Sequence, residues 1–491
     1  MDVPTVRPSE APNPTNSRGP GAVGELTYDQ VEAVQGSPEI NIPEVRPAER
    51  SRFGPLRHRH FRNVWMGACG SNIGRWMEGL AIQWLIADVS KQPTVSMGYL
   101  AVAQMGPTLV LGLYGGLLAD RVNRRTLLLV TQGVMAVLAA LLAVLSWRGM
   151  ATEPDLLVQV LLAIGLLQGI TGAFDMPAWQ VLTPRLVPRE ELTEAIALNG
   201  LQFNLARIVG PALAGAMMTY IPGGATSVFV FNTFSFMFVI LAIARTPDAP
   251  PPTRESDSFW AQTREALLFV FHQRGARAAL MASVVFGLLA TPAQRMLPVF
   301  VKDVLHRQEG TFGMLTAVMG GGAVFGVLVL RVMPRWYPKH HMIPLSIFAC
   351  AIAITAFAAS DWLPLTVAAV FVIGLFWLWT FNMAYAAIQL LVPDRMRGRV
   401  LAVVNVAVFG AMPLGAVIAG YIGEYVAGKA DVGLGAQAGV GVLGVVLAVA
   451  GIVMLTWRTP EVDGLKPGDP GYDRRPGFWR GLTATAHRPQ N

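Results

Sequence analysis

The sequence predicts an all-α membrane protein with twelve transmembrane helices in two six-helix halves. Three observations lead to this fold class: charged residues are scarce along almost the whole chain, apolar segments of spanning length recur, and the two halves resemble each other. Only 14% of the 491 residues are charged and 53% are hydrophobic, whereas an ordinary soluble domain carries about 25% charged residues. We therefore expect most of the surface to face lipid.

The apolar segments are each close to the roughly 20 residues that a helix needs to cross about 30 Å of hydrocarbon. The predicted spans are 63–87, 95–118, 126–147, 156–176, 196–220, 226–244, 278–299, 312–333, 342–359, 363–387, 400–424 and 437–457. They fall into an N-terminal half, 61–244, and a C-terminal half, 278–457. Residues 1–60 are rich in Pro, Glu, Arg and Ser and are expected to form a disordered tail. Residues 458–491 form a second polar tail.

Basic residues indicate how the spans are oriented. If the N-terminus is inside, the inner segments hold 30 of the 38 Lys and Arg residues and the outer loops hold five. Cytoplasmic loops carry such an excess. We expect a multi-pass protein of the plasma (inner) membrane with both termini in the cytoplasm. The excess basic charge lies in short loops between apolar spans, so nucleic acid is not an expected partner.

The two halves repeat at a nearly constant offset. Gly210 and Gly215 fall 205 residues before Gly415 and Gly420. Near the start of each half, Gly98 falls 215 residues before Gly313. Transporters use two such halves related by an axis along the membrane normal.

The central connection, residues 245–277, is the longest between spans. Phe259, Trp260, Arg264 and Leu267 suit a helix that lies in the membrane interface. Such a helix could tether the two halves. The alternative is a simple N-terminal extension of span seven.

The most informative segment is Gly116-Leu-Leu-Ala-Asp-Arg-Val-Asn-Arg-Arg-Thr126, between spans two and three. It resembles the signature loop of the major facilitator superfamily, and we name it the signature loop. Asn123 replaces the usual glycine, and Asn also accepts a left-handed turn. The alternative interpretation is a short basic inner loop.

The resemblance implies a conformational latch. Its residues are Gly116, Asp120, Arg121, Arg124, Arg125 and Asp175. In the family, the aspartate at position 120 meets the start of span eleven, here near Gly398 and Arg399, when the carrier is open to the outside. The basic residue Arg124 is expected to pair with Asp175 at the inner end of span four. A pair that forms in one state and breaks in another is suited to switching.

Span five contains Gly210, Pro211 and Gly215. The segment resembles the antiporter motif of drug and metabolite exporters, although Ala216 replaces its last glycine. Small residues allow a neighbouring helix to approach closely, and Pro211 bends the helix. The motif favours export over import, and generic helix packing is the alternative.

Residues 57–65, 71–78 and 177–188 resemble one subfamily of this superfamily. It includes the enterobactin exporter, macrolide-efflux-like proteins and a lysophospholipid flippase. The likeness covers about residues 55–457 and weakens in the second half. The resemblance identifies the subfamily better than it identifies the transported molecule.

Apart from charges at the span ends, four charged residues lie inside predicted spans, where each costs about 2.5–3.5 kcal/mol at mid-membrane. They are Arg75, Glu78, Arg207 and Arg295. A carboxyl group removed from water favours its protonated form, so Glu78 is the candidate carrier of a coupling proton. The alternative is an ion pair between Glu78 and Arg75, one turn before it. Arg207 and Arg295 are expected either to line the cavity and attract anionic cargo or to neutralise a protonatable carboxylate.

Other chemistry finds little support. No Ser/His/Asp, paired-carboxylate or metal-ligand constellation appears, so we expect no enzyme activity, no catalytic residues, no cofactor and no metal. Gly423–Lys429 matches most of a phosphate-loop pattern, but Ala430 stands where Ser or Thr must bind magnesium. The sequence thus predicts a monomeric exporter of an amphiphilic small molecule (a drug, a siderophore or a related metabolite), working as a proton antiporter by alternating access. The alternatives are a lysophospholipid flippase of the same fold and a membrane-embedded enzyme.

Overall fold

The computed structural model describes residues 53–147, 153–247, 259–332, 339–393, 396–427 and 431–457. Residues 1–52 of the predicted N-terminal tail and the whole predicted C-terminal tail lie outside these ranges. A short 3-10 helix, η1 (Gly54–Arg57), precedes the first long helix, which begins at Arg59.

The long helices match the twelve predicted spans one for one. In the described first half they are α2 (Arg59–Val89), α3 (Pro93–Arg121), α4 (Arg124–Trp147), α5 (Pro154–Leu182), α6 (Leu192–Tyr220) and α7 (Ala225–Ala244). In the described second half they are α9 (Arg274–Arg295), α11 (Glu309–Val332), α12 (Lys339–Ala358), α13 (Leu363–Leu391), α14 (Arg397–Ala427) and α15 (Val432–Leu455). Short turns η2 (Thr183–Arg185) and η3 (Arg189–Glu191) join α5 to α6. The predicted fold class is confirmed.

Among the described residues, ten of these helices are long and apolar enough to cross a membrane. The two that fall short are α2 and α6. They carry three of the four charges that lie away from the span ends, namely Arg75, Glu78 and Arg207. Both helices therefore bring charge into the first half of the bundle.

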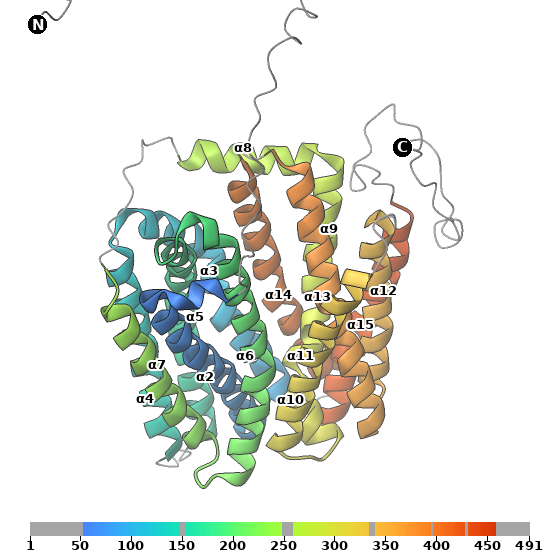
Figure 1. Cartoon of the computed structure of the whole chain (residues 1–491). Helices are drawn as coiled ribbons and strands as arrows, with labels where there is room; N and C mark the ends of the chain where they lie inside the picture. Colours follow the sequence, from blue (N-terminus) through green and yellow to red (C-terminus); the bar gives the residue numbers. More distant parts are fainter. Residues whose placement is uncertain are drawn as a thin grey trace, which may run out of the picture. The chain divides into compact units, whose positions relative to one another are not determined.

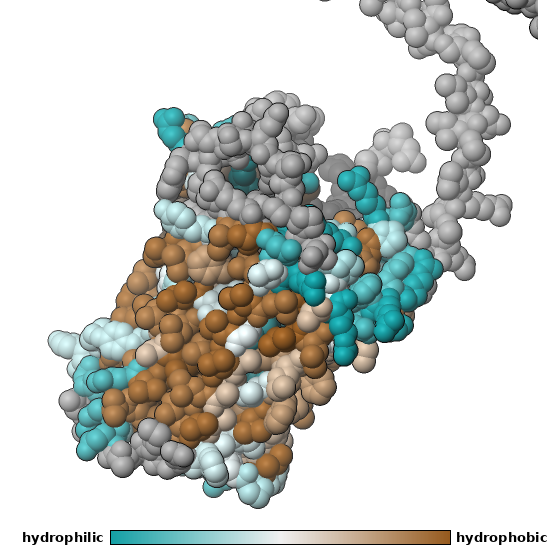
Figure 2. Space-filling view, turned by 90° about the vertical axis from the view of Figure 1, so that its left-hand side faces the viewer, coloured by the Kyte–Doolittle hydropathy of each residue, from teal (hydrophilic) through white to brown (hydrophobic). Residues whose placement is uncertain are grey.

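The outward faces of the long helices are apolar. Val137 of α4 and Phe238 of α7 are 67% and 68% exposed. Figure 2 shows a broad hydrophobic surface on this side of the molecule, with hydrophilic residues gathered toward the ends. Side chains of this kind are suited to lipid rather than water.

The two halves meet through two helix pairs that follow the internal repeat. In one pair, Gly98 of α3 lies so close to α14 that an added Cβ would be 2.7 Å from the Cα of Val417. In the other pair, a Cβ on Gly313 of α11 would be 2.6 Å from the Cα of Gly215 on α6. Gly98 and Gly313 are partners in the repeat. The same close approach is thus made twice, once from each half.

The connection between the halves contains a separate helix, α8 (Phe259–His272), which lies across the ends of the long helices (Figure 1). Gln273 separates α8 from α9. Its side chain accepts a hydrogen bond from the backbone N–H of Ala276 and so caps the start of α9. Glu265 of α8 pairs with Arg399 near the start of α14 at 3.8 Å. The connection is therefore not a simple extension of α9.

The first helix of the second half is broken. Helix α9 ends at Arg295, three residues after Pro292, and the chain continues through α10 (Leu297–Val299) and a π-helical turn, η4 (Phe300–Val304). Proline removes a backbone donor and disturbs the hydrogen-bond ladder of a helix. The break places Arg295 at a helix end in the interior of the bundle.

Candidate functional site

Glu78 lies inside the first half and is only 5% exposed. Its two carboxyl oxygens accept hydrogen bonds from the amide nitrogens of Asn232 on α7 and Gln168 on α5. The Ser235 hydroxyl donates to Oδ1 of Asn232 at 3.0 Å, which orients that amide. Gly74 makes room for it, since a Cβ there would be 2.2 Å from the same oxygen. The immediate partners of Glu78 are therefore neutral.

Arg75 faces a different carboxylate. Its Nη1 donates to Oδ2 of Asp175 on α5 at 3.2 Å, and its Nη2 donates to Asn72 at 2.8 Å. Thr131 and Gln132 of α4 each donate to the other oxygen of Asp175 at 2.8 Å. Among the described side chains, the ion pair of Arg75 is thus with Asp175, and the alternative pair with Glu78 is not formed.

The signature loop is described only in part. The surroundings of Gly116 and the side chains of Asp120 and Arg121 lie outside the described part of the structure, although the backbone of all three continues α3. Asn123 accepts hydrogen bonds from the N–H groups of Arg125 and Thr126, so its side chain caps α4. Asn123 does not adopt the left-handed conformation that it could accept, because the only described non-glycine residue with a positive φ is His306.

The basic residues after the cap have separate roles. The Arg125 guanidinium donates to the carbonyl of Ala244 at the end of α7. Arg124 is buried and has an interaction of its own. The expected partner of Arg124, Asp175, lies beside Thr131, seven residues further along α4. Seven residues correspond to about 10 Å along the helix axis. Among the described residues, the ion pair of Asp175 is with Arg75.

The glycines of span five bring α6 close to two neighbours. A Cβ on Gly210 would be 2.6 Å from Cβ of Trp76 on α2. A Cβ on Gly215 would be 2.8 Å from the Cα of Gly313 on α11. Pro211 lies between them, and its carbonyl oxygen would be 2.6 Å from a Cβ on Gly313. The motif therefore forms contacts within the first half and across to the second.

Arg207 faces a cavity of about 100 Å³ between the halves. The cavity is lined by residues of α2, α6, α9, α11 and α13: Trp76, Arg207, Gln294, Thr316, Met319, Gly320, Ala323, Gly374 and Trp377. Nε and Nη2 of Arg207 are buried, and within the described part of the chain they have no hydrogen-bond partner.

Arg295 lies next to Gln294 but points to α3. Its Nη1 donates to Oε1 of Gln104 at 3.0 Å, and its Nη2 approaches the sulfur of Met105 at 3.4 Å. Both partners belong to the first half, so Arg295 connects the halves through neutral groups. Arg207 and Arg295 are therefore both in the interior, but among the described residues Arg295 has hydrogen-bond partners and Arg207 has none.

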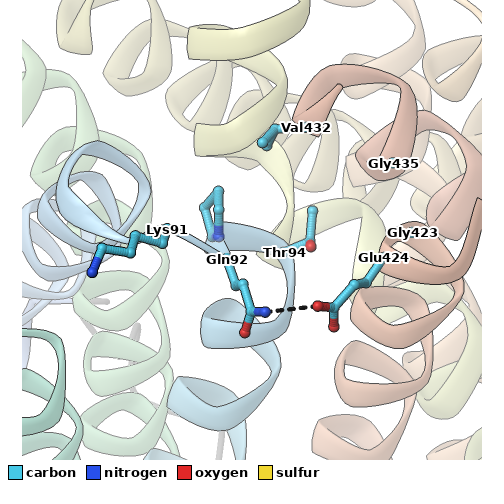
Figure 3. A pocket seen from close by; sticks show the side chains of 8 residues that line it. Lys91, Gln92, Thr94, Gly423, Glu424, Val432 and Gly435 are labelled. Carbon is cyan, nitrogen blue, oxygen red and sulfur yellow. Dashed lines mark hydrogen bonds between the residues drawn. The ribbon is translucent and has the colours of Figure 1, made fainter. Parts of the chain in front are cut away.

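Polar contacts between the halves also occur at the end away from α8. They join Gln92 to Glu424 at 2.7 Å, Tyr99 to Tyr421 at 2.6 Å and Lys302 to Asp88 at 3.0 Å. Figure 3 shows the first of these contacts, with the Gln92 amide reaching the carboxylate of Glu424 on α14. The crevice beside it holds about 10 Å³, which is room for about one water molecule. This crevice is therefore too small for a cargo molecule.

The amides that surround the charges, Gln104, Gln168 and Asn232, are not predicted as site residues by the sequence. The available signal was an uncharged polar residue inside an apolar span, which is costly unless it finds a partner. Such a signal indicates that a partner exists and does not identify it.

The fold and the charged interior define a membrane carrier, a transporter built from two six-helix halves. Residues 50–470 match the family model described as transmembrane secretion effector. The chain belongs to this family of major facilitator transporters, and it is a multi-pass membrane protein rather than an enzyme.

Three characterised proteins show the relationship. The chain is 24% identical to the staphyloferrin A transporter of Staphylococcus aureus (strain NCTC 8325 / PS 47), over 70% of this chain and 85% of that protein. It is 25% identical to the multidrug efflux pump Tap of Mycolicibacterium fortuitum, over 76% and 90%. It is 27% identical to the enterobactin exporter EntS of Salmonella typhi, over 70% and 80%.

Solved structures agree on the fold. The nucleoside transporter NupG superposes with a TM-score of 0.60 at 15% identity, covering 82% of this chain and 100% of that one. At this identity the likeness concerns the fold alone.

Proposed function

We propose that the chain is a monomeric proton antiporter that exports an amphiphilic small molecule by alternating access. The observation that carries the proposal is the environment of Glu78, a buried carboxyl group whose hydrogen-bond partners, Asn232 and Gln168, are both neutral. Arg75, the nearby cation on the same helix, is occupied by Asp175.

This arrangement supports proton binding at Glu78. A buried carboxylate is stable when a cation compensates it, and it otherwise tends to take up a proton. The amides of Asn232 and Gln168 can hydrogen-bond to the ionised and to the protonated carboxyl group, because each amide has a donor and an acceptor group. Glu78 can therefore lose and regain a proton as solvent reaches it from alternate sides, without leaving a neighbouring cation unpaired.

The orientation follows from the basic loops. We place the end that bears α8 in the cytoplasm, with both termini. The described polar contacts at the opposite end then seal the outer side, through Gln92–Glu424, Tyr99–Tyr421 and Lys302–Asp88. The halves would separate there when the carrier opens outward, and the signature loop with Asp120, Arg124 and Asp175 would hold the cytoplasmic side closed.

The cargo class is supported by the relatives, whose names refer to siderophores and drugs. Such molecules combine apolar and polar groups. A cavity lined by two tryptophans, an arginine, Gln294 and Thr316 suits that combination.

Two measurements test the proposal. A deletion strain should accumulate a toxic compound or metabolite that the wild type exports, and a protonophore should abolish the difference. Export indifferent to the protonophore contradicts proton coupling. Counterflow in proteoliposomes should show stimulation by cargo on the opposite side, and its absence contradicts a carrier. If lysophospholipid rather than a soluble compound is moved, the chain is a flippase.

A further inference from the structure

The cavity beside Arg207 contains a cation that no described group neutralises. Trp76 and Arg207 come from the first half, whereas Gln294, Thr316 and Trp377 come from the second. The cavity is therefore built by both halves, and any molecule bound in it contacts both. A site of this kind responds to the relative movement of the halves.

The orphaned atoms of Arg207 are Nε and Nη2. In the planar guanidinium these two nitrogens form one edge, and their N–H groups point in parallel. This edge matches the two oxygens of a carboxylate, which it can bind through two parallel hydrogen bonds. Arginine remains protonated in proteins. The two N–H groups of this edge therefore need a hydrogen-bond acceptor.

The described carboxylates of the bundle interior do not provide that acceptor. Asp175 is paired with Arg75, and Glu78 accepts from Asn232 and Gln168. No described Asp or Glu lies within 4.0 Å of Arg207 or Arg295. Arg295, whose partners are Gln104 and Met105, adds a second positive charge to the interior.

The other residues that line the cavity indicate which chemical group carries this acceptor. Trp76 and Trp377 present indole rings, which bury large apolar area and pack against other flat rings. Gln294 and Thr316 can contact a polar substituent. An aromatic ring that carries a carboxylate fits both the walls and the guanidinium edge.

We propose that this cavity binds the anionic end of the cargo, an aryl carboxylate whose two oxygens accept from Nε and Nη2 of Arg207. The inference deepens the proposed function and rests on it, because it assigns the substrate class of the same exporter. On binding, the carboxylate supplies the acceptor that Nε and Nη2 lack among the described residues, and its ring packs against the indoles that line the cavity.

Binding to the purified full-length chain in lipid nanodiscs tests this assignment. The probes are salicylate and salicylamide, which have nearly the same shape and differ in charge. Tryptophan fluorescence reports binding, and isothermal titration calorimetry checks it. We expect salicylate to bind at least about tenfold more tightly than salicylamide, as one charge-assisted contact would provide.

Variants locate the preference. In Arg207→Gln, salicylate and salicylamide should bind equally. In Arg207→Lys part of the preference should remain, because lysine keeps the charge but not the planar edge. Arg307→Gln removes an exposed arginine outside the cavity and should keep the wild-type ratio. Melting curves of each variant confirm that it is folded.

The assignment is overturned if salicylate does not bind, if both probes bind equally to the wild type, or if the preference survives in Arg207→Gln. These outcomes are separate from failure of the proposed function. Export that does not depend on the proton gradient would leave the probe ratio unchanged, whereas loss of the ratio would leave proton-coupled export of another cargo intact.

Discussion

Nη1 of Arg75 donates to Oδ2 of Asp175 across 3.2 Å, from α2 to α5. The contact pairs the guanidinium with Asp175 rather than with Glu78, one turn further along the same helix. Asp175 and Arg75 therefore form a compensated ion pair, whereas Glu78 is a separate carboxyl group whose partners are amides. This division underlies the role that we assign to Glu78.

Replacing Glu78 by Gln should uncouple transport from the proton gradient. Glutamine keeps the shape and can still contact Asn232 and Gln168, but it has no proton to exchange. We expect export against a gradient to fall to the level seen with a protonophore, while cargo exchange in proteoliposomes continues. Glu153→Gln, at an exposed position, is the control. Gradient-driven export by the Glu78→Gln variant would contradict the assignment.

The pair of Arg75 and Asp175 should contribute to stability. Removing one partner of a buried pair costs about 3–5 kcal/mol. Since the Arg75 side chain is 34% exposed, we expect about 1–3 kcal/mol for Arg75→Gln after screening by solvent. A double-mutant cycle with Asp175→Asn, measured by denaturation in detergent, should show coupling. The parallel cycle with Arg124→Gln should show weaker coupling in this conformation, and equal coupling in the two cycles contradicts the pairing.

A methyl group on Gly215 should disturb the contact between the halves. Its Cβ would be 2.8 Å from the Cα of Gly313, where backbone cannot yield easily. Overpacking of this kind costs about 1–3 kcal/mol, enough to lower transport by about tenfold. Gly200→Ala on the same helix has open space around its Cβ and should keep full transport in proteoliposomes. If both variants transport equally, α6 and α11 do not need this approach.

Arg207→Gln should stabilise the cargo-free protein. The change removes a buried charge whose Nε and Nη2 have no described partner, so we expect a gain of about 1–2 kcal/mol. Arg295→Gln should instead lower stability, because it deprives Gln104 of its donor. Thermal unfolding in nanodiscs measures both. A lower midpoint for Arg207→Gln would mean that the guanidinium is already satisfied.

Much of the architecture follows from local properties of the chain. Helix α7 could be predicted because a segment of 20 residues that is predominantly apolar and carries no charge has few alternatives in a membrane. The repeat also predicted that Gly98 and Gly313 occupy equivalent positions. The unusual charges of α2 and α6 were visible as well, because a charge among apolar residues stands out wherever the helix lies.

The interaction partners of these buried charged residues could not be predicted from local properties of the sequence. The spacing along α2 indicated Glu78 as a possible ion-pair partner of Arg75, yet the partner is Asp175, one hundred residues away. Asn232 likewise reaches Glu78 from a helix 154 residues further on. Hydropathy and periodicity depend on neighbours in the chain, so they established the spans, the repeat and the presence of buried charge. Partners depend on which faces of distant helices pack together, and so the pairing of Arg75, the neutral shell of Glu78 and the open edge of Arg207 emerged with the packed bundle.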